Sequence, residues 1–317
     1  MSRREPIGHL LVYLAGRLIF ALMALLPTRA ARRVGAVLGR LFFHLSPRHR
    51  RIALGNLAAA LGDRLSETER LDVAHASFAH LGAIVADATH FPRHVRRPTE
   101  ELAVYDGVEH LQAAAALGRG VLVFSGHYGH WELVALLQHR LGLPMTMVVS
   151  PLENTRYDRF ITRLRQISGN TILSKRRAAR PILKALHEGR AIAILIDQNV
   201  RGEGGLFVDF FGRPASTTPA LATLAFRSGA PIVPVFSWFL PDGRLQISYR
   251  PMIQAVRQGA IEDDIRVLTR SCTAILEEEI RRRPSFWMWM HNRWRTRPPE
   301  PVGAAAAGTG RRAEARG

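Results

Sequence analysis

The spacing of apolar and polar positions divides the chain into a helical part and an alternating part. Before residue 103, apolar residues recur at helical spacing, which predicts helices at 7–26, 30–44, 47–61 and from Ser66 to about Thr89. Ser66-Glu-Thr-Glu69 has the pattern of a capping box, with an N-cap serine and a glutamate three residues later. We therefore expect three to four helices before any strand.

From Val104 the pattern changes to short apolar runs that alternate with longer amphipathic segments. The expected strands are 103–106, 120–125, 145–150, 191–196, 231–238 and 244–250. The expected helices are 108–117, 130–142, 154–168, 178–188, 216–228 and 262–282. This alternation predicts one α/β domain, a mixed sheet with helices on both faces. Residues 1–29, 30–298 and 299–317 are then an N-terminal membrane anchor, the α/β domain with its helical lead, and a disordered Ala/Gly/Arg tail.

Residues 7–26 are apolar over a length that suits a bilayer. Arg17 lies near their middle, where a charge is costly unless the side chain reaches the interface or the helix lies in it. No small-residue cleavage site follows, which argues against a removed signal peptide. Basic residues flank both ends, so charge bias leaves the orientation open. A membrane anchor is the expectation, a buried helix the alternative, and spanning and interfacial placements both remain open.

Charge changes this picture further. The 317-residue chain has a formal net charge of +18, and all but two of its 44 basic residues are arginine. Arginine suits bidentate contacts to phosphate and carboxylate, so an acidic protein, anionic lipid or nucleic acid is a candidate partner. A GC-rich genome is the simpler source of the arginine excess. Cys272 is the single cysteine, which excludes disulfides within the chain and cysteine-rich zinc sites.

The candidate chemistry centres on Val121–Glu132. An apolar run ends at Ser125-Gly126, and the residues from Trp131 onward read as a buried helix. His127 then lies in a strand-to-helix loop, and Glu132 in the first turns of the helix. Five residues of continuous helix would separate two side chains by roughly 140°. With His127 on the loop, both side chains can face one point above the strand end, where open α/β sheets bind ligands.

The pair of His127 and Glu132 suggests a general base and a carboxylate that orients it. Neutral imidazole can take a proton from an alcohol, and a carboxylate on its other nitrogen fixes the tautomer. The helix N-terminus adds backbone N–H groups for a developing oxyanion. The alternative is a structural loop histidine beside a glutamate favoured by the helix dipole. His127, His130 and Glu132 are the nearest possible metal ligands, but alcohol attack already has its base, so we expect no metal and no cofactor.

Three other stretches carry chemical residues. A buried strand runs into Asp197-Gln198-Asn, which is either a site carboxylate or a structural cap. Ser216 and Thr217 are good N-caps for the helix expected to follow them. A basic helix carries Arg156, Arg159, Arg163 and Arg165, most of them expected at the surface, with one or two able to hold phosphate. Residues 286–297 are aromatic and basic together, which fits a membrane interface, nucleic acid or a packed C-terminal closure.

Taken in order, these residues resemble the lipid A late acyltransferase family, the lauroyl and myristoyl transferases of the lysophospholipid acyltransferase superfamily. The similarity runs through the N-terminal anchor, Arg51…Asn56-Leu57, His127-x4-Glu132 and Asn154…Asp158…Arg165. It continues through Asp197-Gln-Asn, Phe207-Val-Asp-Phe-Phe-Gly, Thr217-Thr218 and Trp287-Met-Trp-Met-His-Asn-Arg-Trp. His-x4-Glu alone is a weak signal, whereas the ordered set over roughly 10–298 is specific. Asp197-Gln-Asn departs from the usual Asp-His/Gln-Asp, which puts the substrate in doubt more than the chemistry.

The resemblance implies a glycerolipid-acyltransferase-like fold and an acyltransferase activity. An acyl carrier protein thioester would be the donor and a hydroxyl of a lipid A precursor the acceptor, at the cytoplasmic face of the inner membrane. His127 would be the general base and Glu132 its partner. Arg165, Asp197, Gln198 and Thr217 would contact the substrates.

Two competing functions remain open. A relative could acylate another membrane lipid, such as a glycolipid, a phosphatidylinositol mannoside or a lysophospholipid. A nucleic-acid-binding protein would account for the charge but leaves the apolar N-terminus and the His127–Glu132 pair unexplained, so we expect no nucleic acid partner.

Overall fold

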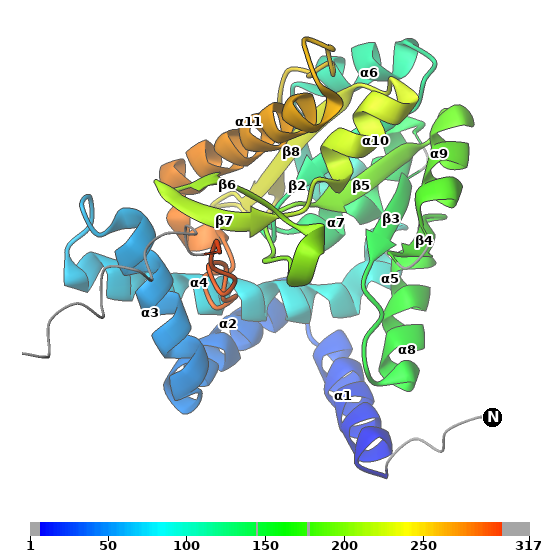
Figure 1. Cartoon of the computed structure of the whole chain (residues 1–317). Helices are drawn as coiled ribbons and strands as arrows, with labels where there is room; N and C mark the ends of the chain where they lie inside the picture. Colours follow the sequence, from blue (N-terminus) through cyan, green and yellow to red (C-terminus); the bar gives the residue numbers. More distant parts are fainter. Residues whose placement is uncertain (1–6, 144, 176–177, 300–317) are drawn as a thin grey trace, which may run out of the picture.

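The computed structural model describes residues 7–143, 145–175 and 178–299, and begins with the predicted helical part (Figure 1). Its helices are α1 (Ile7–Leu25), α2 (Thr28–Leu45), α3 (Pro47–Leu61), α4 (Glu67–Asp87) and α5 (Phe91–His94), with 3-10 turns η1 (Ala88–His90) and η2 (Thr99–Glu101). The capping box is confirmed at the start of α4, where the Ser66 hydroxyl accepts from the backbone N–H of Glu69 and the Glu69 carboxylate accepts from the backbone N–H of Ser66.

The α/β part contains a seven-stranded sheet in the order β1-β9-β8-β2-β5-β3-β4. Its strands are β1 (Ala103–Asp106), β2 (Val121–Ser125), β3 (Met145–Val149), β4 (Thr171–Ser174), β5 (Ala191–Leu195), β8 (Ile232–Phe239) and β9 (Leu245–Tyr249). All neighbours run parallel except β8 and β9, so the predicted mixed sheet is confirmed. A separate antiparallel hairpin consists of β6 (Leu206–Phe210) and β7 (Arg213–Thr217).

Helices cover both faces of this sheet, as predicted (Figure 1). They are α6 (Val108–Ala116), α7 (Trp131–Leu137), α8 (Thr155–Gln166), α9 (Ala179–His187), α10 (Ala220–Ser228) and α11 (Ile261–Arg282), with 3-10 turns η3 (Gln138–Leu141), η4 (Gly202–Gly204) and η5 (Pro284–Phe286). Every residue of β2 is buried, because Leu122 and Phe124 pack towards α9, α10 and α11 while Val121 and Val123 pack towards α6 and α7. A central parallel strand is buried on both sides in this way.

The helix predicted at 216–228 begins later than expected. Ser216 and Thr217 form the end of β7, α10 begins at Ala220, and Pro219 is its N-cap residue. The prediction that Ser216 and Thr217 cap this helix is therefore wrong. Their hydroxyls bind backbone carbonyl oxygens instead. Ser216 Oγ donates to the Val200 carbonyl, and Thr217 Oγ1 donates to the Ala215 carbonyl. Neither β4 nor the two strands of the β6–β7 hairpin are among the strands that the pattern of apolar residues predicts.

Helices α2 and α4 cross at very close range because three glycines line their contact. A Cβ on Gly39 would lie 2.1 Å from the Phe78 carbonyl oxygen, and one on Gly35 would lie 2.3 Å from that of Gly82. Only residues without a side chain permit this backbone approach. The crossing fixes α2 on α4 and thereby on the α/β domain.

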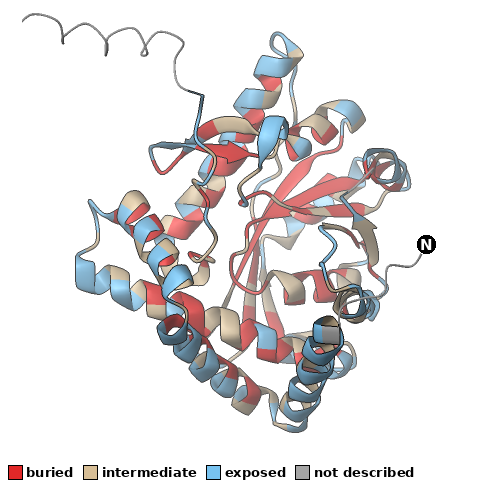
Figure 2. Cartoon of the chain, turned by 60° about the horizontal axis from the view of Figure 1, so that its bottom comes forward, coloured by how far each residue is buried: buried red, intermediate tan, exposed pale blue. Residues whose placement is uncertain are grey.

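Helix α1 extends away from the sheet and packs beside α8 (Figure 1). Gly8–Leu25 is long and apolar enough to cross a membrane, and none of this stretch is buried inside the protein (Figure 2). Leu11, Leu18 and Leu25 are more than half exposed, at 62%, 61% and 77%. Of the two expectations for this segment, the buried helix is wrong. The tail predicted after residue 298 lies almost entirely outside the described residues.

Candidate active site

The site forms where two neighbouring parallel strands end. β2 and β5 pair in register from Val121↔Ala191 to Ser125↔Leu195. His127 and Asp197 each follow two residues beyond that last pair, so the strands place them side by side. Carboxyl ends of parallel strands are the usual ligand-binding edge of an α/β sheet.

Asp197 holds His127 through two contacts, one with the imidazole and one with the backbone. Its Oδ1 lies 2.8 Å from His127 Nδ1, and its Oδ2 accepts the His127 backbone N–H at 2.8 Å. Trp287 Nε1 donates to the same Oδ2 at 2.8 Å. Because a carboxylate only accepts, Nδ1 carries the proton and Nε2 is left as the basic nitrogen. Burial raises the pKa of Asp197, but the charge and hydrogen bonds of His127 outweigh it and the net pKa is lowered.

Glu132 has a different partner, which corrects the predicted pairing. Its carboxylate accepts from Arg165 Nε at 2.9 Å and from Arg165 Nη2, forming a bidentate ion pair between α7 and α8. The orienting carboxylate of His127 is thus Asp197 and not Glu132. The physical reason is the sheet order, since β5 lies directly beside β2 and places Asp197 at the Nδ1 edge of the imidazole ring. Burial lowers the pKa of the Arg165 guanidinium, but Glu132 more than compensates and the net pKa is raised.

A cavity of about 1070 Å³ opens over these groups. Four of the predicted site residues, His127, Glu132, Arg165 and Gln198, line it. Its deeper wall is apolar and comes from the strands and α7 through Val123, Val134, Ala135, Met145 and Met147. The described rim is basic and includes Arg48, Lys175, Arg201 and Arg295. A cavity with an apolar wall and a polar, basic rim suits a ligand that has both a hydrocarbon portion and an anionic or polar portion.

Thr217 does not belong to this wall in the described structure. It is 1% exposed and accepts a hydrogen bond from Arg293 Nη2, while the neighbouring Thr218 lines the cavity. The structure therefore places Thr218, and not the predicted Thr217, on the cavity wall. Thr217 is the last residue of β7 and is buried, whereas Thr218 follows the strand.

The aromatic segment after α11 closes the site from behind, which decides between its three interpretations. Trp287 and Trp289 are 1% and 0% exposed. The Met288 backbone N–H donates to the His127 carbonyl at 3.1 Å, and that of Gly129 donates to the Phe286 carbonyl at 2.9 Å. This segment is a packed closure that fixes the loop that carries His127. The sequence resemblance included it, but composition alone could not separate it from a surface motif.

Asp87 lies behind the loop that carries His127, and the sequence analysis did not identify it. It ends α4, is fully buried, and accepts from His130 Nε2 at 2.9 Å, from His94 Nε2 at 3.3 Å and from Arg32 Nε at 2.6 Å. His130 Nδ1 in turn accepts the Leu133 backbone N–H at the start of α7. Burial raises the pKa of Asp87, but the histidine hydrogen bonds reverse this and hold it well below its usual range. Asp87 thus links the N-terminal helices to the loop that carries His127.

The three side chains considered as metal ligands have separate partners. His127 contacts Asp197, His130 contacts Asp87, and Glu132 contacts Arg165. Among the described residues, no group of three or more His, Cys, Asp or Glu side chains is placed to hold a metal ion. Cys272 is buried, which raises the pKa of its thiol to about 12.

The chain matches known proteins over almost its whole length. Residues 4–296 match the model of the bacterial lipid A biosynthesis acyltransferase family. A lipid A biosynthesis acyltransferase of Haemophilus influenzae is 24% identical, covering 89% of this chain and 87% of its own length. A lipid A biosynthesis lauroyltransferase of Escherichia coli is 28% identical, covering 87% of this chain and 89% of its own. A phosphatidylinositol mannoside acyltransferase of Mycobacterium tuberculosis is 26% identical over 60% of each chain. The chain is thus an acyltransferase and belongs to the bacterial lipid A biosynthesis acyltransferase family.

Proposed function

We propose that this enzyme moves a fatty acyl chain from an acyl carrier protein thioester to a hydroxyl of a lipid A precursor, at the cytoplasmic face of the inner membrane. The observation that carries the proposal is the His127 Nδ1–Asp197 Oδ1 contact of 2.8 Å in a cavity with an apolar wall. It provides a positioned base beside a space that suits an acyl chain. The exposed apolar α1 and the basic rim support a membrane acceptor and an acidic donor.

His127 Nε2 takes the proton of the acceptor hydroxyl as its oxygen attacks the thioester carbonyl carbon. Asp197 stabilises the imidazolium that forms. The tetrahedral intermediate then expels the carrier thiolate, which takes the proton back from His127, so the products are an ester and a free thiol. A positioned base of this kind contributes about 10²–10⁴ in rate.

Glu132 and Arg165 position the acceptor in this mechanism. Their ion pair is only 15% and 23% exposed and forms part of the cavity wall beside His127. An Arg–carboxylate fork has a fixed geometry and retains acceptor lone pairs on the carboxylate, which can take a hydrogen bond from a sugar hydroxyl. Gln198 Nε2, 3.3 Å from His127 Nε2, marks where a substrate oxygen would sit.

The test is acyl transfer by the full-length enzyme in detergent micelles. The donor is acyl carrier protein that carries a radiolabelled acyl chain, and the acceptor is a lipid A precursor. His127→Ala should lower kcat by about 10²–10⁴ while membrane association stays unchanged. The reaction should proceed without a trapped acyl-enzyme and should be insensitive to chelators. A stable acyl-enzyme, or activity lost to a chelator and restored by zinc, would exclude direct transfer by this base.

A second acceptor class is supported by the mycobacterial relative, whose name specifies a phosphatidylinositol mannoside. Lipid mass spectrometry of a deletion strain separates the two. Lipid A species short of one acyl chain are expected under the first proposal, whereas glycolipids short of one chain would assign the enzyme to the second.

A further inference from the structure

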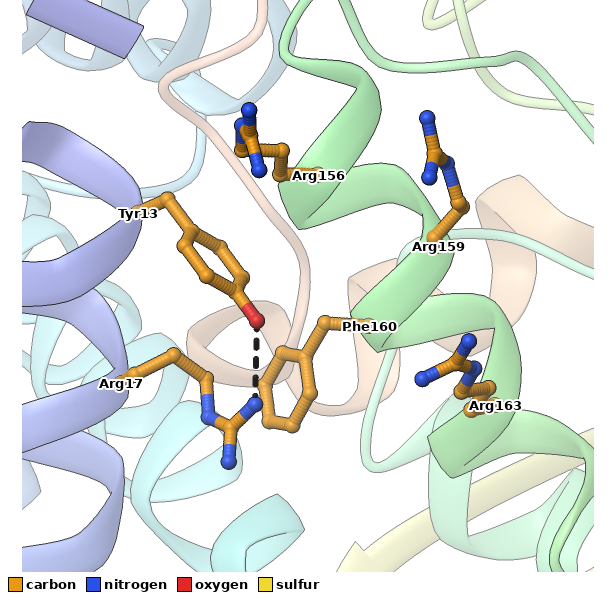
Figure 3. A pocket seen from close by; sticks show the side chains of 6 residues that line it. All are labelled: Tyr13, Arg17, Arg156, Arg159, Phe160 and Arg163. Carbon is orange, nitrogen blue, oxygen red and sulfur yellow. Dashed lines mark hydrogen bonds between the residues drawn. The ribbon is translucent and has the colours of Figure 1, made fainter. Parts of the chain in front are cut away.

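A basic notch lies between α1 and α8, outside the catalytic cavity (Figure 3). Its volume is about 120 Å³, and its described lining is Tyr13, Arg17, Arg156, Arg159, Phe160 and Arg163. Four of these six side chains are guanidinium groups, and none is a carboxylate. Because Arg17, Arg159 and Arg163 bring like charges to one hollow, an anion bound there would reduce their mutual repulsion.

The notch is held in shape by aromatic contacts. The Arg17 guanidinium lies 4.5 Å from the centre of the Phe160 ring and donates to Tyr13 Oη at 3.1 Å. Phe20 meets Phe160 edge to face, with ring centres 4.9 Å apart. These contacts fix α1 against α8 and direct the Arg17 head group into the notch (Figure 3). The cost of a charge in the middle of an apolar helix is thereby reduced.

Helix α8 presents different arginines on its two sides. At about 100° per residue, Arg156, Arg159 and Arg163 share one face, and Arg165 points about 180° away from Arg156. The first three face α1 and the notch, whereas Arg165 faces the catalytic cavity and binds Glu132. The notch is thus a separate binding surface on the same helix.

Contacts along α1 place its polar side on α8 for most of its length. Asn154 Nδ2 donates to the His9 carbonyl at 2.8 Å, Tyr157 lies against Gly16, and Phe160 contacts Phe20. The opposite side exposes Leu11, Leu14, Leu18, Leu22 and Leu25. A helix flanked by a basic polar helix cannot have hydrocarbon on all sides. The pair of α1 and α8 therefore has one apolar side, made by the leucines of α1, and one basic side, made by Arg17 and the arginines of α8, which is the pattern of a surface that lies in the membrane interface.

We propose that the α1–α8 notch binds the headgroup phosphate of an anionic membrane phospholipid, and that α1 lies in the interface with its leucine side among the acyl chains. Lipid is favoured over an acidic protein because the exposed leucines are on the same helix that supplies Arg17. Guanidinium groups bind phosphate oxygens in bidentate fashion. Bound lipid would hold α8, and with it Arg165, at a fixed depth below the acceptor-bearing membrane surface.

The test is co-flotation of the full-length protein with phosphatidylcholine vesicles, with and without phosphatidylglycerol. Arg159→Gln/Arg163→Gln should lower binding to phosphatidylglycerol vesicles by about tenfold or more and leave binding to pure phosphatidylcholine unchanged. The matched control is Arg266→Gln/Arg270→Gln, which removes the same charge from exposed positions on α11, away from α1. The control should reduce binding by far less. Equal losses in both variants would show only general charge attraction and overturn the site.

Arg17→Leu gives the sharper result. The substitution makes α1 more apolar, so a helix that crosses the bilayer should bind every vesicle more strongly. If the notch binds phosphate, the substitution should instead reduce the ratio of binding to phosphatidylglycerol vesicles over binding to pure phosphatidylcholine vesicles. Stronger binding with undiminished preference would overturn the proposal.

Kinetics in detergent micelles without phospholipid distinguish the other possible occupants. If Arg159→Gln/Arg163→Gln raises KM for the carrier donor or the lipid acceptor while vesicle binding is unchanged, the notch serves a substrate and the proposal is wrong. Vesicle binding needs no turnover, so these results are independent of whether the proposed acyl transfer is correct.

Discussion

Asp197 and Glu132 are the two carboxylates near His127, and replacing them should affect different kinetic constants. Asp197→Asn replaces an acceptor with an amide that cannot select the Nδ1–H tautomer, so we expect kcat to fall by about 10²–10⁴ with little change in KM. Glu132→Gln removes the ion pair with Arg165 and should act mainly through the KM for the lipid acceptor. The measurement is steady-state acyl transfer with both substrates varied.

A charge exchange provides the control for this prediction. Glu132→Arg combined with Arg165→Glu should recover activity relative to either single variant, because the ion pair is re-formed across α7 and α8. Two results together would contradict this assignment: Glu132→Gln lowering kcat as far as His127→Ala does, and Asp197→Asn changing kcat little. They would support the His127–Glu132 pair expected from the sequence.

At this scale the sequence located the residues but not their contacts. His127 could be placed on a strand-to-helix loop because an apolar run stops at Ser125-Gly126. Asp197 was recognised at a strand end as well. Their contact depends on β5 lying beside β2, with β3 and β4 intervening in sequence, and no local pattern encodes that adjacency. Spacing within one motif favoured Glu132, which is near in sequence but has Arg165 as its partner.

Among the elements, the α2–α4 crossing makes a quantitative test possible. Gly39→Ala would place a Cβ 2.1 Å from the Phe78 carbonyl oxygen, so the helices must separate, and we expect the free energy of unfolding to fall by about 1–3 kcal/mol. Gly55→Ala, within α3, would meet nothing within 4 Å and should raise it by about 0.5–1 kcal/mol. Thermal unfolding in detergent measures both. A neutral Gly39→Ala would mean that the two helices are not in backbone contact.

The elements themselves were predictable where periodicity was strong. Long amphipathic helices such as α4 and α11 were found within a few residues, since many positions repeat the same pattern. β4 is short and only half-buried, so it has no clean alternation. The hairpin of β6 and β7 is rich in glycine and aromatic residues and resembled a loop, because its pairing is made across a turn at Phe211-Gly212.

For the whole molecule, the basic rim of the cavity should attract an acidic carrier protein. Exposed Arg201 and Arg295 line the rim, and charge steering weakens as salt shortens the Debye length. Raising the ionic strength should therefore raise the KM for carrier protein donor. Arg201→Gln/Arg295→Gln should have a higher KM at low salt and a flatter salt dependence. A rim variant with the salt response of the unmodified enzyme would place the docking surface elsewhere.

Stability should also fall in mild acid. Burial lowers the pKa of His80 to about 3, so the folded protein keeps it neutral while the unfolded chain protonates it near its ordinary pKa of about 6.5. Protonation then favours the unfolded chain as pH falls below about 6.5, and the loss should reach about 1 kcal/mol between pH 7 and pH 5.5. His80→Leu should flatten this part of the pH dependence, as measured by melting temperature. An unchanged slope would mean that His80 is accessible to protons in the folded state.

The position of Asp87 has a consequence for dividing the molecule. Its three partners come from α2, α5 and the loop before α7, so one carboxylate joins segments that the sequence separates by up to a hundred residues. A truncation that removes only α1 leaves this junction whole and is a reasonable route to a water-soluble enzyme. A truncation that also removes α2 would leave the buried Asp87 carboxylate without Arg32 and would loosen the loop that carries His127. Helices α2 and α4 are therefore part of the unit that holds the loop with His127, whereas α1 takes no part in this junction.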